Sequence, residues 1–475
     1  MKIDISENKK RIMKRMQFIK SIRRVALVFA LAWILSFSSC KPTPKPIAEN
    51  EPYKVEHPVW AKNATIYEVN IRQFTPEGTF AAFQQHLPRL KDLGVDILWI
   101  MPIHPIGELN RKGELGSYYS IKDYKAVNPE FGTIDDFKNL VNEAHKHGMK
   151  IIIDWVANHT SHDNHLAYSN PEFYVKDSIG NFVSPFDWTD VIQLNYQNSG
   201  LRDYMVGALK FWIEEADIDG YRCDVASMVP TDFWNRARKE LDAIKPVFML
   251  AEAEEVSLQE FAFDADYGWE FHHIMNEIAK GKKTVLDIDH YFVKEQAKYP
   301  KNTIRMHFTS NHDENSWNGT EFERLADAAE TFAALTYVIP GMPLIYNGQE
   351  VGFNRRLDFF DKDSIDWIEG SMFAELYKKL NVLKHENSAL AAGEAAADMV
   401  RVKTSNDVNV LSFIRSNEND KVFVVFNLSN LLQEITMEGE DYFGSYADII
   451  SGEKVIFSEG VKLTLEPWQF YIYAK

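Results

Sequence analysis

The chain has 475 residues, of which 45% are hydrophobic, and its formal net charge is −17. It is long enough to bury a large core, and we expect one large domain with a smaller one, since a single compact sandwich would be shorter. The acidic balance argues against nucleic acid as a partner and fits a neutral substrate.

The first 39 residues differ in kind from the rest. Basic residues between Lys2 and Arg24 precede an apolar run from Val25 to Phe37, which is too short to span a membrane. This plan is typical of a signal peptide, and the Cys40 that follows two serines resembles the processing site of a bacterial lipoprotein. We expect residues 1–39 to be removed and Cys40 to carry a lipid, with an uncleaved anchor as the alternative.

A proline-rich stretch follows the leader. Residues 40–58 alternate Pro with Lys and Glu, which favours an extended tether. An exported, membrane-anchored lipoprotein is the expectation, either periplasmic or on the cell surface. Lipidation of Cys40 would leave Cys223 without a disulfide partner, as a free thiol.

From Trp60 onward, short β-branched or aromatic runs alternate with helical patterns, which is typical of parallel βα units. The sequence predicts a (β/α)8 TIM barrel over residues 59–390, with a short insertion after the third strand at about 159–198. Patterning in 391–475 predicts a C-terminal antiparallel β-sandwich. The eight expected strands begin at Ile66, Ile97, Lys150, Gly220, Val247, Phe261, Ile304 and Met342, and the clearest helices cover 79–93, 134–147, 201–216, 230–243, 322–338 and 373–385.

Four of the predicted strands end in polar clusters, and a barrel places such ends on one face. In the cluster Gly220–Ser227, alternation points Arg222 and Asp224 the same way. A neighbouring Arg favours the ionised carboxylate, so we expect it to lower the pKa of Asp224, as suits a nucleophile. An ordinary buried ion pair is the alternative.

The other clusters are Asn158-His159, Glu252 and Asn311-His312-Asp313. In this order the four resemble the α-amylase superfamily, glycoside hydrolase family thirteen, and the resemblance covers Val59 to the C-terminus. It implies a retaining mechanism with Asp224 as nucleophile, Glu252 as acid/base and Asp313 as the third carboxylate. Glu254 and Glu255 compete with Glu252 for the second role.

The same resemblance implies substrate-binding residues. Arg222, His159 and His312 match positions that orient the nucleophile and hydrogen-bond the sugar beside it. Tyr119 resembles the family tyrosine that stacks on that sugar. Asp154 is expected to support the barrel wall and is not assigned a chemical role.

Departures from the family pattern narrow the interpretation. Ser227 and Met228 stand where many amylases carry a Lys and a His that bind the leaving side. Asn158 matches a frequent calcium ligand, but Gln193 replaces an Asp that usually accompanies it, and calcium prefers several carboxylate oxygens. We therefore expect no required cofactor, with calcium at Asn158 as the alternative.

The expected activity is α-amylase-like hydrolysis of starch-derived α-glucans and maltooligosaccharides. A transglycosidase of the same family, such as a glucanotransferase or a trehalose synthase-like isomerase, shares every catalytic residue and stays open. A non-catalytic glucan-binding lipoprotein is the alternative from another class. Because the insertion is short, few side chains are available to bind sugars far from the cleaved bond. We therefore expect kcat/KM to level off at maltooligosaccharides of only a few units, with little further gain on polymeric starch.

Overall fold

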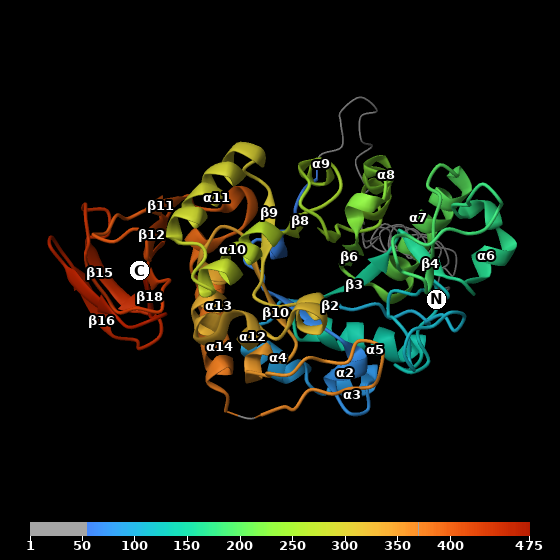
Figure 1. Cartoon of the computed structure of the whole chain (residues 1–475), viewed down its shortest axis with the longest axis horizontal. Coiled ribbons are helices and arrows are strands. Elements are labelled where there is room, and N and C mark those ends of the chain that lie inside the picture. The colour runs from blue at the N-terminus through green and yellow to red at the C-terminus, as the bar shows by residue number, and fades with distance from the viewer. Residues whose placement is uncertain (1–54, 369) are drawn as a thin grey trace, which may run out of the picture. The chain divides into compact units, whose positions relative to one another are not determined.

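The protein is described by a computed structural model over residues 55–368 and 370–475, so Cys40 and most of the proposed leader and tether lie outside the described residues. Eight parallel strands close into a barrel in the order β1-β2-β3-β6-β7-β8-β9-β10 (Figure 1). The strands are β1 (Ile66–Val69), β2 (Ile97–Ile100), β3 (Lys150–Val156), β6 (Gly220–Asp224), β7 (Phe248–Ala251), β8 (Ala265–Tyr267), β9 (Ile304–His307) and β10 (Met342–Tyr346). The predicted barrel is therefore confirmed, although β8 begins four residues later than expected.

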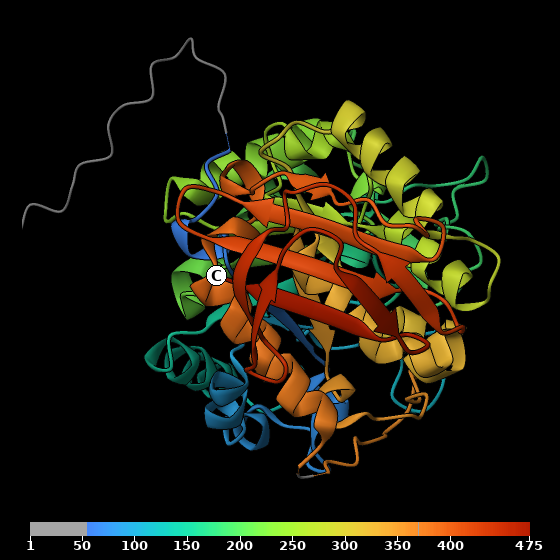
Figure 2. The same cartoon turned by 90° about the vertical axis from the view of Figure 1, so that its left-hand side faces the viewer.

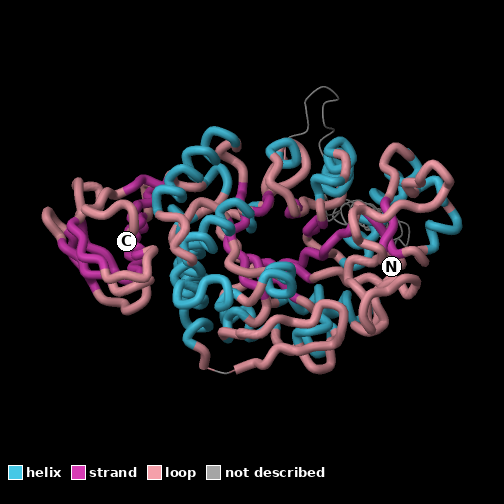
Figure 3. The backbone as a smooth tube through the Cα atoms, in the orientation of Figure 1, coloured by secondary structure: helices cyan, strands magenta, loops and turns pink. Residues whose placement is uncertain are grey.

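Strand alternation divides the barrel core into two clusters. Inward side chains, among them Trp99 and Phe248, pack together inside the barrel, and outward ones such as Tyr67 and Met249 pack against the surrounding helices. In Figure 3 these strands lie in the middle of the barrel domain, with helices around them. On β6, the Arg222 side chain points inward and Cys223 outward, where it is buried as a free thiol.

Capping and apolar faces explain the helices. Thr133 and Asp136 form a capping box at the start of α5 (Ile134–Lys146), whose buried face packs on the barrel. The other long barrel helices are α7 (Ser199–Ala216), α8 (Thr231–Asp242), α10 (Trp269–Ala279), α11 (Val285–Lys298), α13 (Ala329–Val338) and α14 (Met372–Glu386).

Two predicted helices are broken. Residues 79–93 form α3 (Phe80–Gln84) and α4 (Leu87–Leu93), since Pro88 in the first turn of α4 starts a new helix. Residues 322–338 divide into α12 (Glu321–Leu325) and α13 because Ala326 has φ 49° and ψ −128°, outside the helical region.

The insertion after β3 is a small unit of its own. Its strands β4 (His159–Ser161) and β5 (Val191–Gln193) pair antiparallel, with His159 opposite Gln193. The short helix α6 (His165–Ser169) lies between them in sequence. Because β4 continues directly from the end of β3, the insertion extends the barrel's carboxyl-end face.

The C-terminal segment forms a six-stranded antiparallel sheet in the order β11-β12-β13-β18-β15-β16 and a separate pair β14-β17 (Figure 2). Alternate residues of β13 (Lys421–Asn427) face two cores: Val424 packs with the barrel cluster and Phe423 with the β14-β17 side. The remaining strands are β11 (Met399–Arg401), β12 (Val410–Ser416), β14 (Gln433–Thr436), β15 (Gly444–Asp448), β16 (Lys454–Phe457), β17 (Lys462–Leu465) and β18 (Phe470–Ala474).

The end of the predicted tether differs from expectation. Val55 is 4% exposed, and the ring of His57 lies 2.8 Å from both Asp264 Oδ1 and the Asn302 carbonyl. Residues 55–58 therefore pack on the barrel, because an apolar side chain and a buried carboxylate partner outweigh the extended preference of the prolines. Within the described residues, no helix has the length and apolarity that crossing a bilayer requires.

Candidate active site

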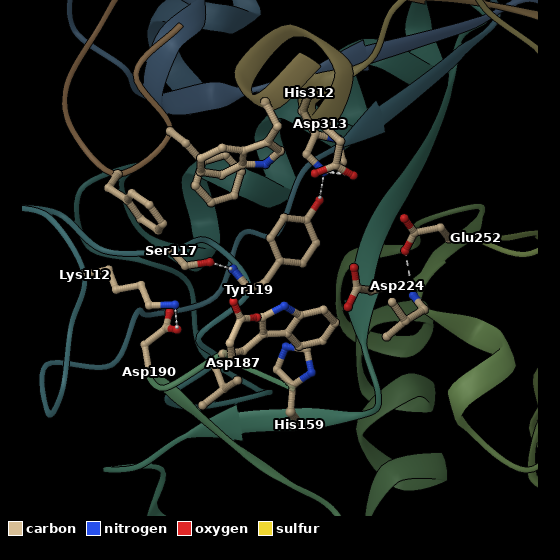
Figure 4. A pocket seen from close by; sticks show the side chains of 16 residues that line it. Lys112, Ser117, Tyr119, His159, Asp187, Asp190, Asp224, Glu252, His312 and Asp313 are labelled. Atoms are coloured by element: carbon tan, nitrogen blue, oxygen red, sulfur yellow. Dashed lines mark hydrogen bonds and ion pairs between the residues drawn. The ribbon is translucent and has the colours of Figure 1, made fainter. Parts of the chain in front are cut away.

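The carboxyl ends of the strands bring the predicted site residues together. Asp224 is the last residue of β6, Glu252 follows β7 directly, and Asp313 lies in the loop after β9. All three line one cavity of about 380 Å³ (Figure 4). Tyr119, His159 and His312 line it as well.

A single buried guanidinium joins the carboxylates. Arg222 Nη1 donates to Asp154 Oδ1 at 2.9 Å and to Asp224 Oδ1 at 3.1 Å. Its Nη2 forms an ion pair with Glu252 Oε2 at 3.0 Å, without hydrogen-bond geometry. Arg222 is fully buried, so its charge acts at low dielectric on every partner.

Burial decides the net protonation behaviour of the pair Asp224 and Glu252. It raises the pKa of Asp224 well above the usual range, with the charge of Glu252 adding to the shift and Arg222 opposing it. Burial also raises the pKa of Glu252, against Arg222 and with help from Asp313. Arg222 does lower the pKa of Asp224, as expected, but burial and the charge of Glu252 outweigh it, so the net shift of this pKa is upward. Two such carboxyls favour holding one proton between them.

A second network surrounds His312. Its Nδ1 lies 2.5 Å from Glu68 Oε1 and its Nε2 lies 2.7 Å from the hydroxyl of Tyr119. The Tyr119 hydroxyl donates to Asp154 Oδ2 at 3.0 Å, so it accepts from His312. Both ring nitrogens of His312 then donate, which requires the charged imidazolium. Burial opposes that charge, but Asp313 and Glu68 outweigh it and raise the pKa of His312 to about 9.

The insertion supplies a further wall. The rings of His159 and Trp188 lie 5.4 Å apart, and both side chains line the cavity. Burial lowers the pKa of His159 to about 4, so the ring is neutral at physiological pH and can donate one hydrogen bond to a sugar. Asp187 and Asp190 of the insertion line the same cavity.

Comparison with known proteins identifies the family. The catalytic-domain model of alpha amylase matches residues 51–177 and 165–422, and the C-terminal domain model of maltogenic amylase matches 400–472. The chain belongs to the α-amylase family. It is a glycoside hydrolase.

Two solved structures and one further sequence relative are similar to most of this chain. An α-amylase from Lactobacillus plantarum is 32% identical with a TM-score of 0.79, covering 88% of this chain and 99% of that one. A noncanonic maltogenic α-amylase, AmyB from Thermotoga neapolitana, is 29% identical with a TM-score of 0.80, covering 87% and 99%. The α-amylase MalA of Haloarcula japonica is 27% identical over 425 residues, which are 86% of this chain and span 61% of that relative's length.

In this amylase-family enzyme, the structure separates Glu252 from its two competitors. Glu254 Oε1 pairs with Arg305 Nη2 at 2.6 Å, and Glu255 precedes α9 (Val256–Gln259) as its N-cap. Neither of them lines the cavity that contains Asp224. The position of Glu252 against Val225 and Arg222 therefore makes it the acid/base candidate.

Several residues in and around the cavity were not singled out from the sequence. Glu68 on β1, the partner of His312, is a fully buried carboxylate, and a charged residue in an apolar strand is the signal that could have found it. No comparable signal marks the others, since Lys112, Phe359 and Phe360 belong to irregular loops and Trp317 to a one-turn π-helix, and these segments meet only in the folded chain.

The candidate calcium ligand has a protein partner. Asn158 is buried, and its Nδ2 lies 3.3 Å from His159 Nδ1. Over residues 55–368 and 370–475, no three His, Cys, Asp or Glu side chains come together as a metal site would require.

Proposed function

We propose that the enzyme hydrolyses α-glucosidic bonds of starch-derived glucans and maltooligosaccharides with retention of configuration. The observation that supports this best is that Asp224 and Glu252 contact the same guanidinium. Retaining glycosidases need two carboxyls about 5 Å apart, close enough for direct attack on the sugar. The relative from Thermotoga neapolitana is described as maltogenic, which fits a short-chain glucan substrate.

The proposed reaction has two steps. Glu252 donates its proton to the glycosidic oxygen while a carboxylate oxygen of Asp224 attacks the anomeric carbon, and the leaving sugar departs with that proton. Glu252 then removes a proton from water, whose oxygen displaces Asp224 and restores both groups. Asp313 holds sugar hydroxyls, His312 holds the hydroxyl of Tyr119, and the Tyr119 ring lies against the sugar face.

The test is the stereochemistry and the product length. Proton NMR of maltotriose hydrolysis should show the α-anomer first, and Asp224→Asn should abolish turnover. Initial rates on maltose through maltoheptaose should reach a plateau after a few units, with little gain on amylose. Inversion, or full activity of Asp224→Asn, contradicts the proposal. Oligomers longer than a maltoheptaose substrate would instead indicate transglycosylation.

We further infer a membrane tether, with Cys40 as the lipidated residue and an exported location. The leader, the two serines before Cys40 and the proline-rich stretch after it support this inference. The site needs no cofactor in this proposal, because protein carboxyls supply both the nucleophile and the acid.

A further inference from the structure

One ion pair lies at one end of the active-site cavity (Figure 4). Lys112 Nζ lies 3.0 Å from Asp190 Oδ1, and we name this pair the Lys112–Asp190 bridge. Lys112 belongs to the loop after β2, and Asp190 directly precedes β5 in the insertion. Asp190 is held in place further, because Ser120 Oγ donates to its carbonyl at 3.0 Å. Its side chain is 7% exposed, so the bridge is more than a solvated surface contact.

A third segment is bound to the same loop. The N–H of Leu115 donates to the Phe360 carbonyl at 3.0 Å, and the N–H of Glu114 donates to Asp361 Oδ1 at 2.7 Å. Phe359 and Phe360 line the cavity beside Lys112. The loops after β2 and β10 and the insertion are therefore joined at this end.

The position of the acid/base candidate Glu252 indicates which part of the substrate the Lys112–Asp190 bridge faces. Glu252 must reach the oxygen of the leaving sugar, so the leaving group lies on the side of Glu252. In Figure 4, Lys112 and Asp190 lie at the opposite end of the cavity from Glu252, with Tyr119 between them. The bridge is therefore at the end that receives the glycone, the non-reducing part of the substrate.

We propose that the Lys112–Asp190 bridge closes the glycone end of the cavity and restricts the enzyme to releasing short units from the non-reducing ends of its substrates. The inference rests on the proposed hydrolysis of α-glucans. To cleave an internal bond, a glucan would have to continue past the joined loops, which requires the bridge to open. The cavity of about 380 Å³ lies within the roughly 300–1,000 Å³ that ligand pockets occupy.

The experiment uses maltoheptaosides with and without a 4,6-O-ethylidene group on the non-reducing sugar. The blocked substrate cannot be degraded from that end, so only an open cavity cleaves it. Full-length wild type, Lys112→Ala and Asp190→Asn are compared by chromatography of the first products. Lys122→Ala is the matched control, since Lys122 is equally exposed, lies in the same loop and pairs with Glu108 outside this cavity.

We expect the wild type to release one short product from the unblocked substrate and to cleave the blocked one poorly. Lys112→Ala and Asp190→Asn should raise the rate ratio of blocked to unblocked substrate about fivefold or more, the scale of one partly buried ion pair. Lys122→Ala should keep the wild-type ratio. Equal wild-type rates on both substrates, or wild-type ratios in both bridge variants, would overturn the proposal. Failure of the wild type to cleave either substrate would instead refute the proposed hydrolysis, and the bridge function with it.

Discussion

The Oε2 atom of Glu252 accepts a 2.7 Å hydrogen bond from the backbone N–H of Val225, the residue after Asp224. Val225 has φ 37° and ψ 48°, a left-handed conformation that is rare for a β-branched residue. Such a conformation costs about 1–2 kcal/mol. The strained turn thus directs one N–H at the acid/base while it ends the nucleophile strand.

Replacing Val225 by Asn should stabilise the protein, because Asn tolerates the left-handed region. We expect the free energy of unfolding to rise by about 1 kcal/mol, measured by urea denaturation. The backbone N–H remains, so the contact with Glu252 should persist. Val175→Asn is the control: Val175 is also half-buried but has an ordinary φ, and its replacement should destabilise. An equal loss of stability in both variants would show that the turn is not strained.

Glu252→Ala should separate acid catalysis from nucleophilic attack. On maltotriose the rate should fall about 10²–10⁴-fold, the usual contribution of a general acid. On α-maltosyl fluoride the rate of the first step should fall far less, since fluoride leaves without needing a proton. Glu254→Ala serves as control and should retain activity on both substrates. The assignment fails if Glu252→Ala loses as much activity on the fluoride as on maltotriose.

The sequence predicted the barrel because eight short apolar runs alternate with helical patterns, and four of these runs end in polar clusters. Asp224 and Glu252 could be placed at strand ends for that reason, and alternation placed Arg222 beside Asp224. The network of His312 was only partly predictable. Its partner Glu68 lies 244 residues away in sequence, and their contact exists because β1 and the loop after β9 end on the same face of the barrel.

Loop conformation and desolvation could not be predicted from the sequence. Lys112 meets Asp190 through an irregular loop whose path depends on tertiary contacts with the segment around Phe360. The net rise in the pKa of Asp224 depends on how much water the folded site excludes, which no local pattern encodes.

Among the insertion's aromatics, Phe173 and Tyr174 are buried, whereas Tyr168 and Phe186 are exposed and Trp188 lines the cavity.

Cys40→Ala should release the protein from membranes. A lipid on Cys40 would supply the anchor. Fractionation of cells that express each form, with metabolic labelling by a fatty acid, measures this. The wild type should be labelled and sediment with membranes, whereas the variant should be neither. A wild-type protein that sediments with membranes but carries no fatty-acid label would rule out lipid anchoring and favour the uncleaved leader as the anchor.

Chelation should leave the enzyme active. Gln193 stands where an Asp usually accompanies Asn158, so we expect no required calcium, and removing divalent cations with EDTA should change neither the initial rate on maltotriose nor the Tm. Activity and thermal unfolding are measured before and after dialysis against EDTA, then after calcium is added back. A fall in Tm by several degrees that calcium reverses would show a structural metal.

His312 should make stability fall at alkaline pH. Its two ring nitrogens face Glu68 and the Tyr119 hydroxyl, with Asp313 3.4 Å from Nε2, and Arg222 is the opposing charge nearby. Burial disfavours the imidazolium, but the carboxylates raise its pKa to about 9, above the ordinary value of 6.5. A group whose pKa is raised on folding stabilises the protein fully below its unfolded pKa. That contribution is lost as the pH rises through the folded pKa.

The expected window is therefore from pH 6.5 to about pH 9, over which the wild type should lose about 3 kcal/mol of unfolding free energy from this one group. His312→Gln cannot titrate, so urea denaturation across this window should give a flatter profile than the wild type. His159→Gln is the matched control: burial lowers the pKa of His159 to about 4, so the native ring is already neutral and its loss should leave the alkaline slope unchanged. Parallel slopes for the wild type and His312→Gln would show that His312 is neutral in the folded protein, and that the Glu68 contact does not hold a charged ring.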